Sequence, residues 1–228
     1  AGNGPDACLS RGSSDPVNFA LRGAVVNLND PEQFEDCEEV FTWFSESALR
    51  PLRFRSGIYG LPETQDFLML YYRTDICAKL GIDPETDLET WDDIKSILPI
   101  LQSHSMNFGM PVSVVGAAGG TLNLFATLLY QMGGELYVPD PDHEYDGIKT
   151  TLDQDAALDA FKLWTDFYTV YGVPNAYDFS NWFRSGEMPI GIAGYSQYNQ
   201  LSVFAPELEG FWSFAPVPGN GLDEDVAV

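Results

Sequence analysis

The chain has 228 residues, of which 45% are hydrophobic and 14% aromatic, enough to bury the core of one large domain or of two modest lobes. Acidic residues outnumber basic ones by 34 to 11, which gives a formal net charge of −23. A charge of this sign repels phosphate backbones and anionic lipids, so it argues against nucleic acid or a membrane surface as partner.

The three cysteines, Cys8, Cys37 and Cys77, lie far apart and form no CxxC motif. We therefore expect no zinc site and at most one disulfide. Of the two states left open, buried free thiols are expected over a disulfide. We expect no signal peptide at the start of the sequence, and no membrane span, because no apolar run reaches the roughly 18 residues that a span needs.

In the first quarter of the chain, residues 5–10 (PDACLS) are expected to form a short strand. Asp15 is the expected N-cap of a helix to about Leu21, with Pro16 in its first turn. A second helix is predicted within residues 31–44, because its apolar residues fall on one face. Residues 52–62 are expected to form a hairpin, with Ser56-Gly57 at its turn.

Four polar residues, Glu63–Asp66, then interrupt the chain before the continuous apolar run of residues 67–72, which is typical of a strand covered on both faces. Further on, helices are predicted over residues 74–80, ended by Gly81, and over 91–102, 121–132, 179–184 and 197–204. A long helix is expected from Asp153 or Asp155 to about Val170. The apolar side of this long helix is predicted to consist of Leu158, Phe161, Trp164 and Tyr168.

Strands are expected at 107–115, at 188–195 and at 210–219, and an irregular hairpin at 135–152. Because strands alternate with helices, the order favours an α/β fold whose sheet is covered on both faces.

Local motifs for catalysis or metal binding are missing from the sequence. His104 and His143 have no triad or HExxH partner, and GAAGG at 116–120 lacks the GK[ST] of a phosphate-binding loop. The acidic segment 140–146 lacks the glycine and the distal glutamate of an EF-hand. We therefore expect a protein that is not an enzyme and carries no cofactor or metal, although counting carboxylates does not exclude a glycosidase pair.

Several motifs occur in one order along the chain: GPDACL at 4–9, FALRGAVVNLND at 19–30, GIYGLPETQDFLMLYYRTDICAKLGI at 57–82, DLETWDDIKSILPIL at 87–101, NWFRSGEMPIGIAGYSQ at 181–197 and FWSFAPVPG at 211–219. Their order and spacing resemble family 1 extracellular solute-binding proteins, the maltose-binding-like receptors of ABC transporters. The chain departs from the pattern at Arg73, where asparagine is usual, and before Thr90, where proline is missing. Both ends of the pattern are also missing, so we expect a central fragment.

The resemblance implies a periplasmic-binding-protein-like fold of type II, with two lobes and an incomplete N-terminal lobe. It assigns residues 1–64 to the partial N-terminal lobe, 65–214 to the C-terminal lobe and 215–228 to a strand that returns toward the first lobe. It also implies an extracellular receptor, a cell-surface lipoprotein in its full-length form. Its expected partners are a small ligand, a mono- or oligosaccharide, and a membrane permease.

The resemblance puts the two crossovers between the lobes at Glu63–Asp66 and at Phe214–Pro218. Ligand contacts are implied at the first crossover and at three loops, namely Arg11, Ser13, Asp15, Glu63, Gln65, Asp66, Thr121, Asn123, Tyr195, Gln197 and Tyr198. Sugars are held by aromatic faces and by planar polar groups, which the segment 194–200 offers. Purely structural roles stay open for several of these residues, since the tyrosines can be packing residues, Asp15 a helix cap, and residues 63–66 a solvent-facing loop. A sugar hydrolase and an interaction module without a transport role are the competing functions.

Overall fold

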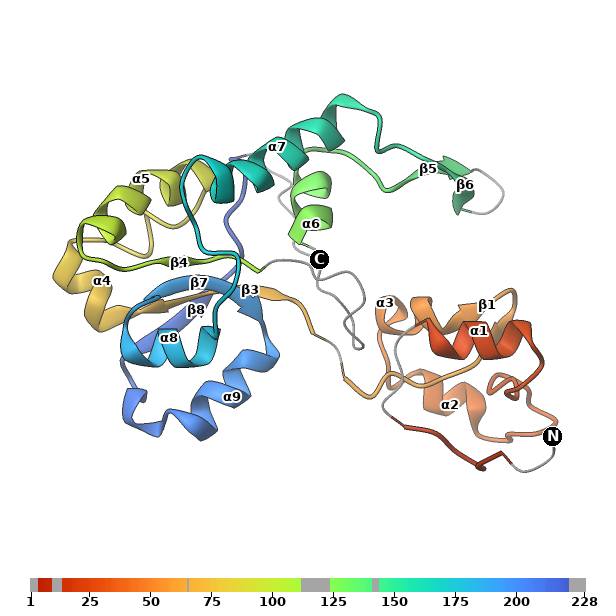
Figure 1. Cartoon of the computed structure of the whole chain (residues 1–228). Helices are drawn as coiled ribbons and strands as arrows, with labels where there is room; N and C mark the ends of the chain where they lie inside the picture. Colours follow the sequence, from red (N-terminus) through yellow and green to blue (C-terminus); the bar gives the residue numbers. More distant parts are fainter. Residues whose placement is uncertain (1–3, 10–13, 65, 112–123, 141–143, 222–228) are drawn as a thin grey trace. The chain divides into compact units, whose positions relative to one another are not determined.

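The computed structural model describes residues 4–9, 14–64, 66–111, 124–140 and 144–221 (Figure 1). The chain forms two compact units. The described residues up to 64 belong to the first, and those from Asp66 onward belong to the second. The second unit holds the larger sheet, and its alternating strands and helices confirm the predicted α/β class.

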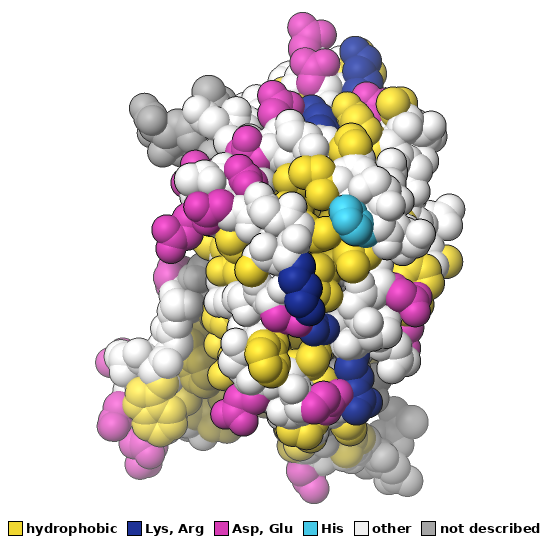
Figure 2. Space-filling model, turned by 90° about the vertical axis from the view of Figure 1, so that its left-hand side faces the viewer, with side chains coloured by type: hydrophobic (Ala, Val, Ile, Leu, Met, Phe, Trp, Pro, Cys, Tyr) yellow, Lys and Arg dark blue, Asp and Glu magenta, His cyan; other side chains and the backbone are white. Residues whose placement is uncertain are grey.

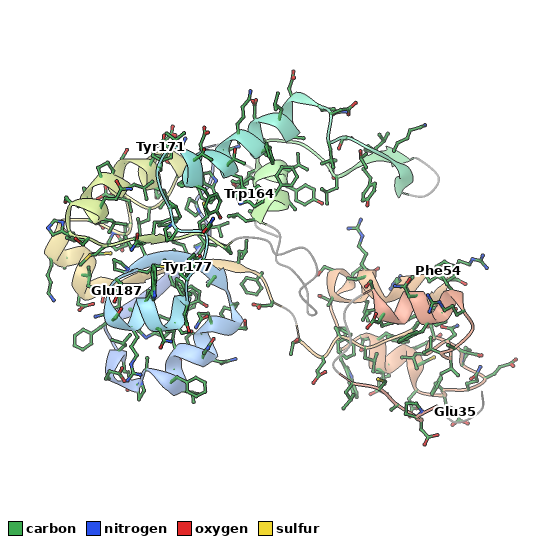
Figure 3. The ribbon with its side chains drawn as sticks, viewed as in Figure 1. Glu35, Phe54, Trp164, Tyr171, Tyr177 and Glu187 are labelled. Carbon is green, nitrogen blue, oxygen red and sulfur yellow. The ribbon has the colours of Figure 1, made fainter. Side chains whose placement is uncertain are left out.

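The first unit is small and mostly helical. Its elements are α1 (Asp15–Leu21), α2 (Cys37–Phe41), α3 (Glu46–Leu49), the 3-10 helix η1 (Arg50–Leu52), β1 (Arg53–Phe54) and β2 (Gly57–Ile58). Strands β1 and β2 pair as an antiparallel hairpin, and Phe54 of β1 lies 6.5 Å from Tyr59 between ring centroids (Figure 3). The buried side chains of this unit include Cys37, Leu49 and Ile58.

Three predictions for the first unit need correction. Residues 4–9 form no strand. The hairpin turn lies at Arg55-Ser56 and not at Ser56-Gly57, because Gly57 already pairs with Phe54. Helix α2 is much shorter than residues 31–44, because residues 30–34 close a separate turn in which the carboxylate of Asp30 accepts the amide of Glu32.

The second unit is built on a four-stranded mixed sheet with strand order β4-β7-β3-β8. These strands are β3 (Leu68–Arg73), β4 (Phe108–Gly109), β7 (Ile190–Gly194) and β8 (Trp212–Ala215). Strand β3 pairs antiparallel with both β7 and β8, while β4 pairs parallel with β7. Strands β5 (Tyr137–Asp140) and β6 (Glu144–Thr150) form the predicted irregular hairpin apart from this sheet.

Helices cover both faces of the sheet, as predicted. They are α4 (Thr74–Leu80), α5 (Trp91–Ser103), α6 (Leu124–Gln131), α7 (Asp155–Thr169), α8 (Phe179–Ser185), α9 (Ser196–Phe204) and the 3-10 helix η2 (Pro206–Leu208). Leu68 and Leu70 of β3 belong to the larger core, to which α4, α5, α6 and α7 also contribute buried residues. Tyr71 faces the smaller core on the other side, with Phe183 of α8 and Leu201 of α9. The alternation along β3 therefore separates two apolar layers.

Several helix ends follow local sequence signals. Thr90 and Asp93 form a capping box at the start of α5, and Asp178 accepts the amide of Asn181 at the start of α8. Gly81 ends α4 at φ +71°, and Gly186 ends α8 at φ +85°, a region that L-residues rarely adopt. These ends lie within a residue or two of their predicted positions.

The predicted apolar side of α7 is confirmed only in part. Trp164 and Tyr168 pack against the larger core, but Leu158 and Phe161 are each 50% exposed. The fully buried residues of α7 are Ala157, Ala160 and Phe167. Small alanines allow α7 to approach α6 closely, and its Trp164 lies 6.3 Å from Phe125 of α6 between ring centroids (Figure 3). The neighbouring helix therefore selects a face that side-chain hydrophobicity alone does not indicate.

Two buried polar side chains connect distant parts of the second unit. The guanidinium of Arg73 donates to both carboxylate oxygens of Asp75, at 2.8 and 2.9 Å, and to the carbonyls of Phe183 and Arg184. The amide of Gln131 accepts the indole N–H of Trp91 at 2.8 Å and donates to the carbonyl of Pro218 at 3.0 Å. Arg73 thus joins β3 to the end of α8, and Gln131 joins α5 and α6 to the segment that follows β8.

The segment after β8 is held by the second unit as far as residue 221. The amide of Trp91 donates to the carbonyl of Gly219 at 2.9 Å, and the amide of Gly219 donates to the carbonyl of Glu89 at 2.8 Å. The return of residues 215–228 toward the first unit stays a prediction, as do the domain limits at 64 and 214.

Candidate functional site

Aromatic side chains gather near the end of the main sheet where β3 begins and β7 ends, and along β8. Leu68, the first residue of β3, pairs with Gly194, the last residue of β7. The chain then turns at Tyr195 and enters α9. We call the rings near this turn the aromatic cluster, which consists of Phe67, Tyr195, Tyr198, Trp212 and Phe214.

The rings of the cluster form a stack with two flanking edge contacts. Tyr195 stacks with Phe67 at 5.0 Å and 12°, and with Tyr198 at 5.9 Å and 10°. Trp212 and Phe214 meet Tyr198 edge-on at 5.6 and 5.8 Å. Phe67 and Tyr198 each remain 39% exposed, whereas Tyr195 is half-buried. The two exposed rings at the ends of the stack can therefore receive an apolar ligand surface.

Polar groups surround the turn that carries the cluster. The carboxylate of Asp66 accepts the amide of Ser196 at 2.9 Å and the hydroxyl of Ser196 at 2.7 Å. The amide nitrogen of Gln197 donates to the hydroxyl of Ser180 at 2.7 Å, which ties α9 to α8. Asp66 and Gln197 thus lie beside Tyr195 and Tyr198, so four of the predicted contact residues come together here.

Tyr71 stabilises the turn through its hydroxyl group. Its hydroxyl donates to the carbonyls of Gly194 and Tyr195, at 3.1 and 3.2 Å. The side chain has no exposed surface, and burial raises the pKa of its phenol well above the usual value. The hydroxyl is therefore protonated at neutral pH and remains a donor.

A groove borders the cluster between α9, η2 and β8. Its volume is about 450 Å³, and its wall includes Tyr198, Trp212 and Phe214 of the cluster together with Ser202 and Glu209. A second hollow, of about 460 Å³, lies on another part of this unit beside Arg73, Asp75, Lys79 and His104. On the face of the molecule drawn in Figure 2, hydrophobic side chains are exposed among acidic ones in the described part of the chain.

The remaining predicted contacts belong to the first unit or fall outside the described residues. Asp15 and Glu63 belong to the first unit, where Asp15 begins α1 and Ser14 takes the N-cap position instead of Asp15. Outside the described residues are Arg11, Ser13, Gln65, Thr121 and Asn123.

The described residues hold neither a metal-binding cluster nor a membrane span. No group of three or more His, Cys, Asp or Glu side chains among them is arranged to hold a metal ion. Nor is any helix in that part of the chain long and apolar enough to cross a bilayer.

Comparison with known proteins identifies the family. A family model described as bacterial extracellular solute-binding protein matches residues 1–225. The chain belongs to this family. The resemblance inferred from the sequence motifs is therefore confirmed.

Solved structures of solute-binding proteins share the fold. A tagatose-bound solute-binding protein of an ABC transporter from Thermotoga lettingae is 22% identical with a TM-score of 0.71, and the match covers 95% of this chain and 54% of that one. Maltose-bound MalE3 of T. maritima is 20% identical with a TM-score of 0.72, covering 93% and 52%. The GacH receptor of Streptomyces glaucescens, solved with acarbose, is 18% identical with a TM-score of 0.68, covering 94% and 52%. The chain thus spans about half the length of these solute-binding proteins.

Several members of the aromatic cluster and its surroundings are not predicted by the sequence motifs. The apolar run at 67–72 predicts Phe67 within a buried strand, but this residue lies just before β3 and is partly exposed. Trp212 and Phe214 lie two residues apart in β8, so the sequence places them on the same side of the sheet. The sequence does not show that their rings contact Tyr198. Ser196 carries no sequence signal, because its partner Asp66 lies 130 residues earlier.

Proposed function

We propose that the protein containing this chain is the solute receptor of an ABC importer, and that it binds a small carbohydrate at the aromatic cluster. Family membership supports the receptor role, and relatives bound to tagatose, maltose and acarbose support carbohydrate as the ligand class. The proposed partner is the membrane permease. The full-length protein is proposed to be extracellular and anchored to the cell surface as a lipoprotein.

One observation carries the proposal: the stack of parallel rings ends in two side chains, Phe67 and Tyr198, that are each 39% exposed. A pyranose ring presents C–H groups on its faces and hydroxyls around its rim. An exposed aromatic face accepts the C–H groups, while neighbouring amide and carboxylate groups accept or donate to the hydroxyls. The cluster is proposed to supply the first kind of contact, and Gln197, which lies in the first turn of α9 beside Tyr195 and Tyr198, is proposed to supply the second.

The proposed mechanism is closure of two lobes around the ligand. A ligand that contacts both lobes favours the closed state over the open one, and the permease then binds the closed receptor. Contacts from the first unit are proposed at Asp15 and Glu63. Further proposed contacts come from the predicted residues outside the described part of the chain, namely Arg11, Ser13, Gln65, Thr121 and Asn123.

A thermal-shift titration with tagatose, maltose, maltotriose and chitobiose tests the proposal. A sugar present at 100 times its Kd stabilises the folded state by about 2.7 kcal/mol, which raises the Tm of a domain of this size by roughly 5–10 °C. The shift is expected to grow with the logarithm of the sugar concentration. A folded protein whose Tm responds to none of these sugars at millimolar concentration would contradict the carbohydrate assignment.

Tyr198→Ala provides the variant and Tyr137→Ala the matched control, because the two tyrosines are similarly exposed, at 39% and 42%. Loss of one stacking ring is expected to weaken binding up to about tenfold. The control, on the separate β5–β6 hairpin, is expected to bind like the wild type. Product release from a chromogenic glycoside in the same samples would favour the competing hydrolase function instead.

A further inference from the structure

The turn between β7 and α9 lacks a local helix cap. Tyr195 occupies the N-cap position of α9 and makes no side-chain capping bond. Tyrosine has no short acceptor that reaches the first-turn amides, unlike the serine, threonine, aspartate and asparagine that usually cap helices. The amide of Ser196 therefore needs an acceptor from another part of the chain.

Asp66 supplies this acceptor from the start of β3. Each of its two carboxylate oxygens accepts one hydrogen bond from Ser196: Oδ1 accepts the amide at 2.9 Å, and Oδ2 accepts the hydroxyl at 2.7 Å. A carboxylate at this place also lies at the positive end of the helix dipole of α9. The side chain of Asp66 thus caps the N-terminus of a helix that begins 130 residues later in the sequence, in place of the side chain of the N-cap residue Tyr195.

Two further residues of the same segment hold the turn. The carbonyl of Phe67 accepts the amide of Tyr195 at 2.7 Å, and the hydroxyl of Tyr71 donates to the carbonyls of Gly194 and Tyr195. Residues 66–71 therefore fix the backbone on which Tyr195 and Tyr198 stand. The near-parallel rings, at 12° and 10°, depend on this backbone because both flanking rings stack on Tyr195.

We infer that Asp66 is a positioning residue of the proposed carbohydrate site, which caps α9 through Ser196 and so sets the orientation of the aromatic cluster. The effect of Asp66 on ligand binding rests on the proposed function. The capping of α9 by Asp66 does not depend on any ligand. A positioning role differs from the direct contact that the family resemblance implied, because Asp66 then affects the ligand only through Ser196 and the rings.

Amide hydrogen exchange of the 228-residue chain without ligand tests the capping. Asp66→Ala is expected to speed exchange at the amides of Tyr195 and Ser196 by about five- to thirtyfold, the factor that corresponds to the loss of a helix cap. Asp66→Asn keeps one acceptor oxygen and is expected to give a smaller change. Asp159→Ala removes an exposed carboxylate from α7 and is expected to leave both amides unchanged. Unchanged exchange at Tyr195 and Ser196 in folded Asp66→Ala would overturn the inference.

A double-mutant cycle separates positioning from direct contact, with maltotriose as the probe. If Asp66 acts through Ser196, the effects of Asp66→Ala and Ser196→Ala on Kd are expected to fall well short of additive. Fully additive effects would show that Asp66 contacts the sugar itself and would overturn the positioning role. Should maltotriose and the other sugars fail to bind, the proposed function fails, while the exchange experiment still decides whether Asp66 caps α9.

Discussion

Replacing Asp75 with asparagine removes the counter-charge of a buried arginine while preserving side-chain size. Arg73 and Asp75 form a bidentate pair, with side chains 10% and 23% exposed. The amide of asparagine keeps one acceptor but no charge, so a charge-assisted pair becomes a single neutral hydrogen bond. Such a loss costs about 1.5–3 kcal/mol when fully buried, and because Asp75 is partly exposed we expect about 1–2 kcal/mol at pH 7.

The lowered pKa of Asp75 determines how the destabilisation changes with pH. The hydrogen bonds and charge of Arg73 hold the pKa of Asp75 below its ordinary value of 3.8. The unfolded chain therefore binds a proton more readily at this site than the folded chain. The stabilisation is fully present above the ordinary pKa and is lost as the pH falls below it. The difference in unfolding free energy between wild type and Asp75→Asn is thus expected to shrink from pH 7 to pH 3.

Urea unfolding followed by tryptophan fluorescence measures this difference, because four of the five tryptophans, Trp91, Trp164, Trp182 and Trp212, lie in the second unit. Asp92→Asn is the matched control, since Asp92 also pairs with a basic residue, Lys95, but is 89% exposed. We expect the control to lie close to wild type at both pH values. A destabilisation by Asp75→Asn that is the same at pH 7 and pH 3 would refute the reasoning.

Other buried features give three shorter predictions. Gln131→Leu is expected to lower the free energy of unfolding of the second unit by about 2–4 kcal/mol, because the indole N–H of Trp91 and the carbonyl of Pro218 lose their buried partner. Urea unfolding measures this loss, and wild-type stability would contradict it. Gly191→Ala is expected to lower the Tm by several degrees, since its new Cβ would lie 2.7 Å from a backbone atom of β4; an unchanged Tm would show that the strands separate without strain. Burial raises the pKa of Cys77 to about 11, so iodoacetamide at pH 8 is expected to label exposed Cys8 long before Cys77 in the native protein. Mass spectrometry measures the two labelling rates, and equal rates would contradict the buried position of Cys77.

The α/β class, the family and most elements of the second unit were predictable from the sequence. The continuous apolar run at 67–72 predicted β3, and Gly81 predicted the end of α4, because these signals act within a few residues. The first unit was predicted less well, since its elements are short. There a side chain such as Asp30 closes a turn of its own and interrupts the helix that the apolar pattern favours.

The aromatic cluster was predicted only in part. Tyr195 and Tyr198 follow an apolar strand in a family motif, so the sequence alone pointed to them. That Phe67 stacks on Tyr195, and that Asp66 caps α9, was decided by the antiparallel register that places Leu68 opposite Gly194. The buried face of α7 was likewise decided by its packing on α6. Local signals fix where an element begins and ends, because capping and turn formation involve neighbouring residues. Contacts across a sheet or between helices depend on register and packing, which only the folded chain determines.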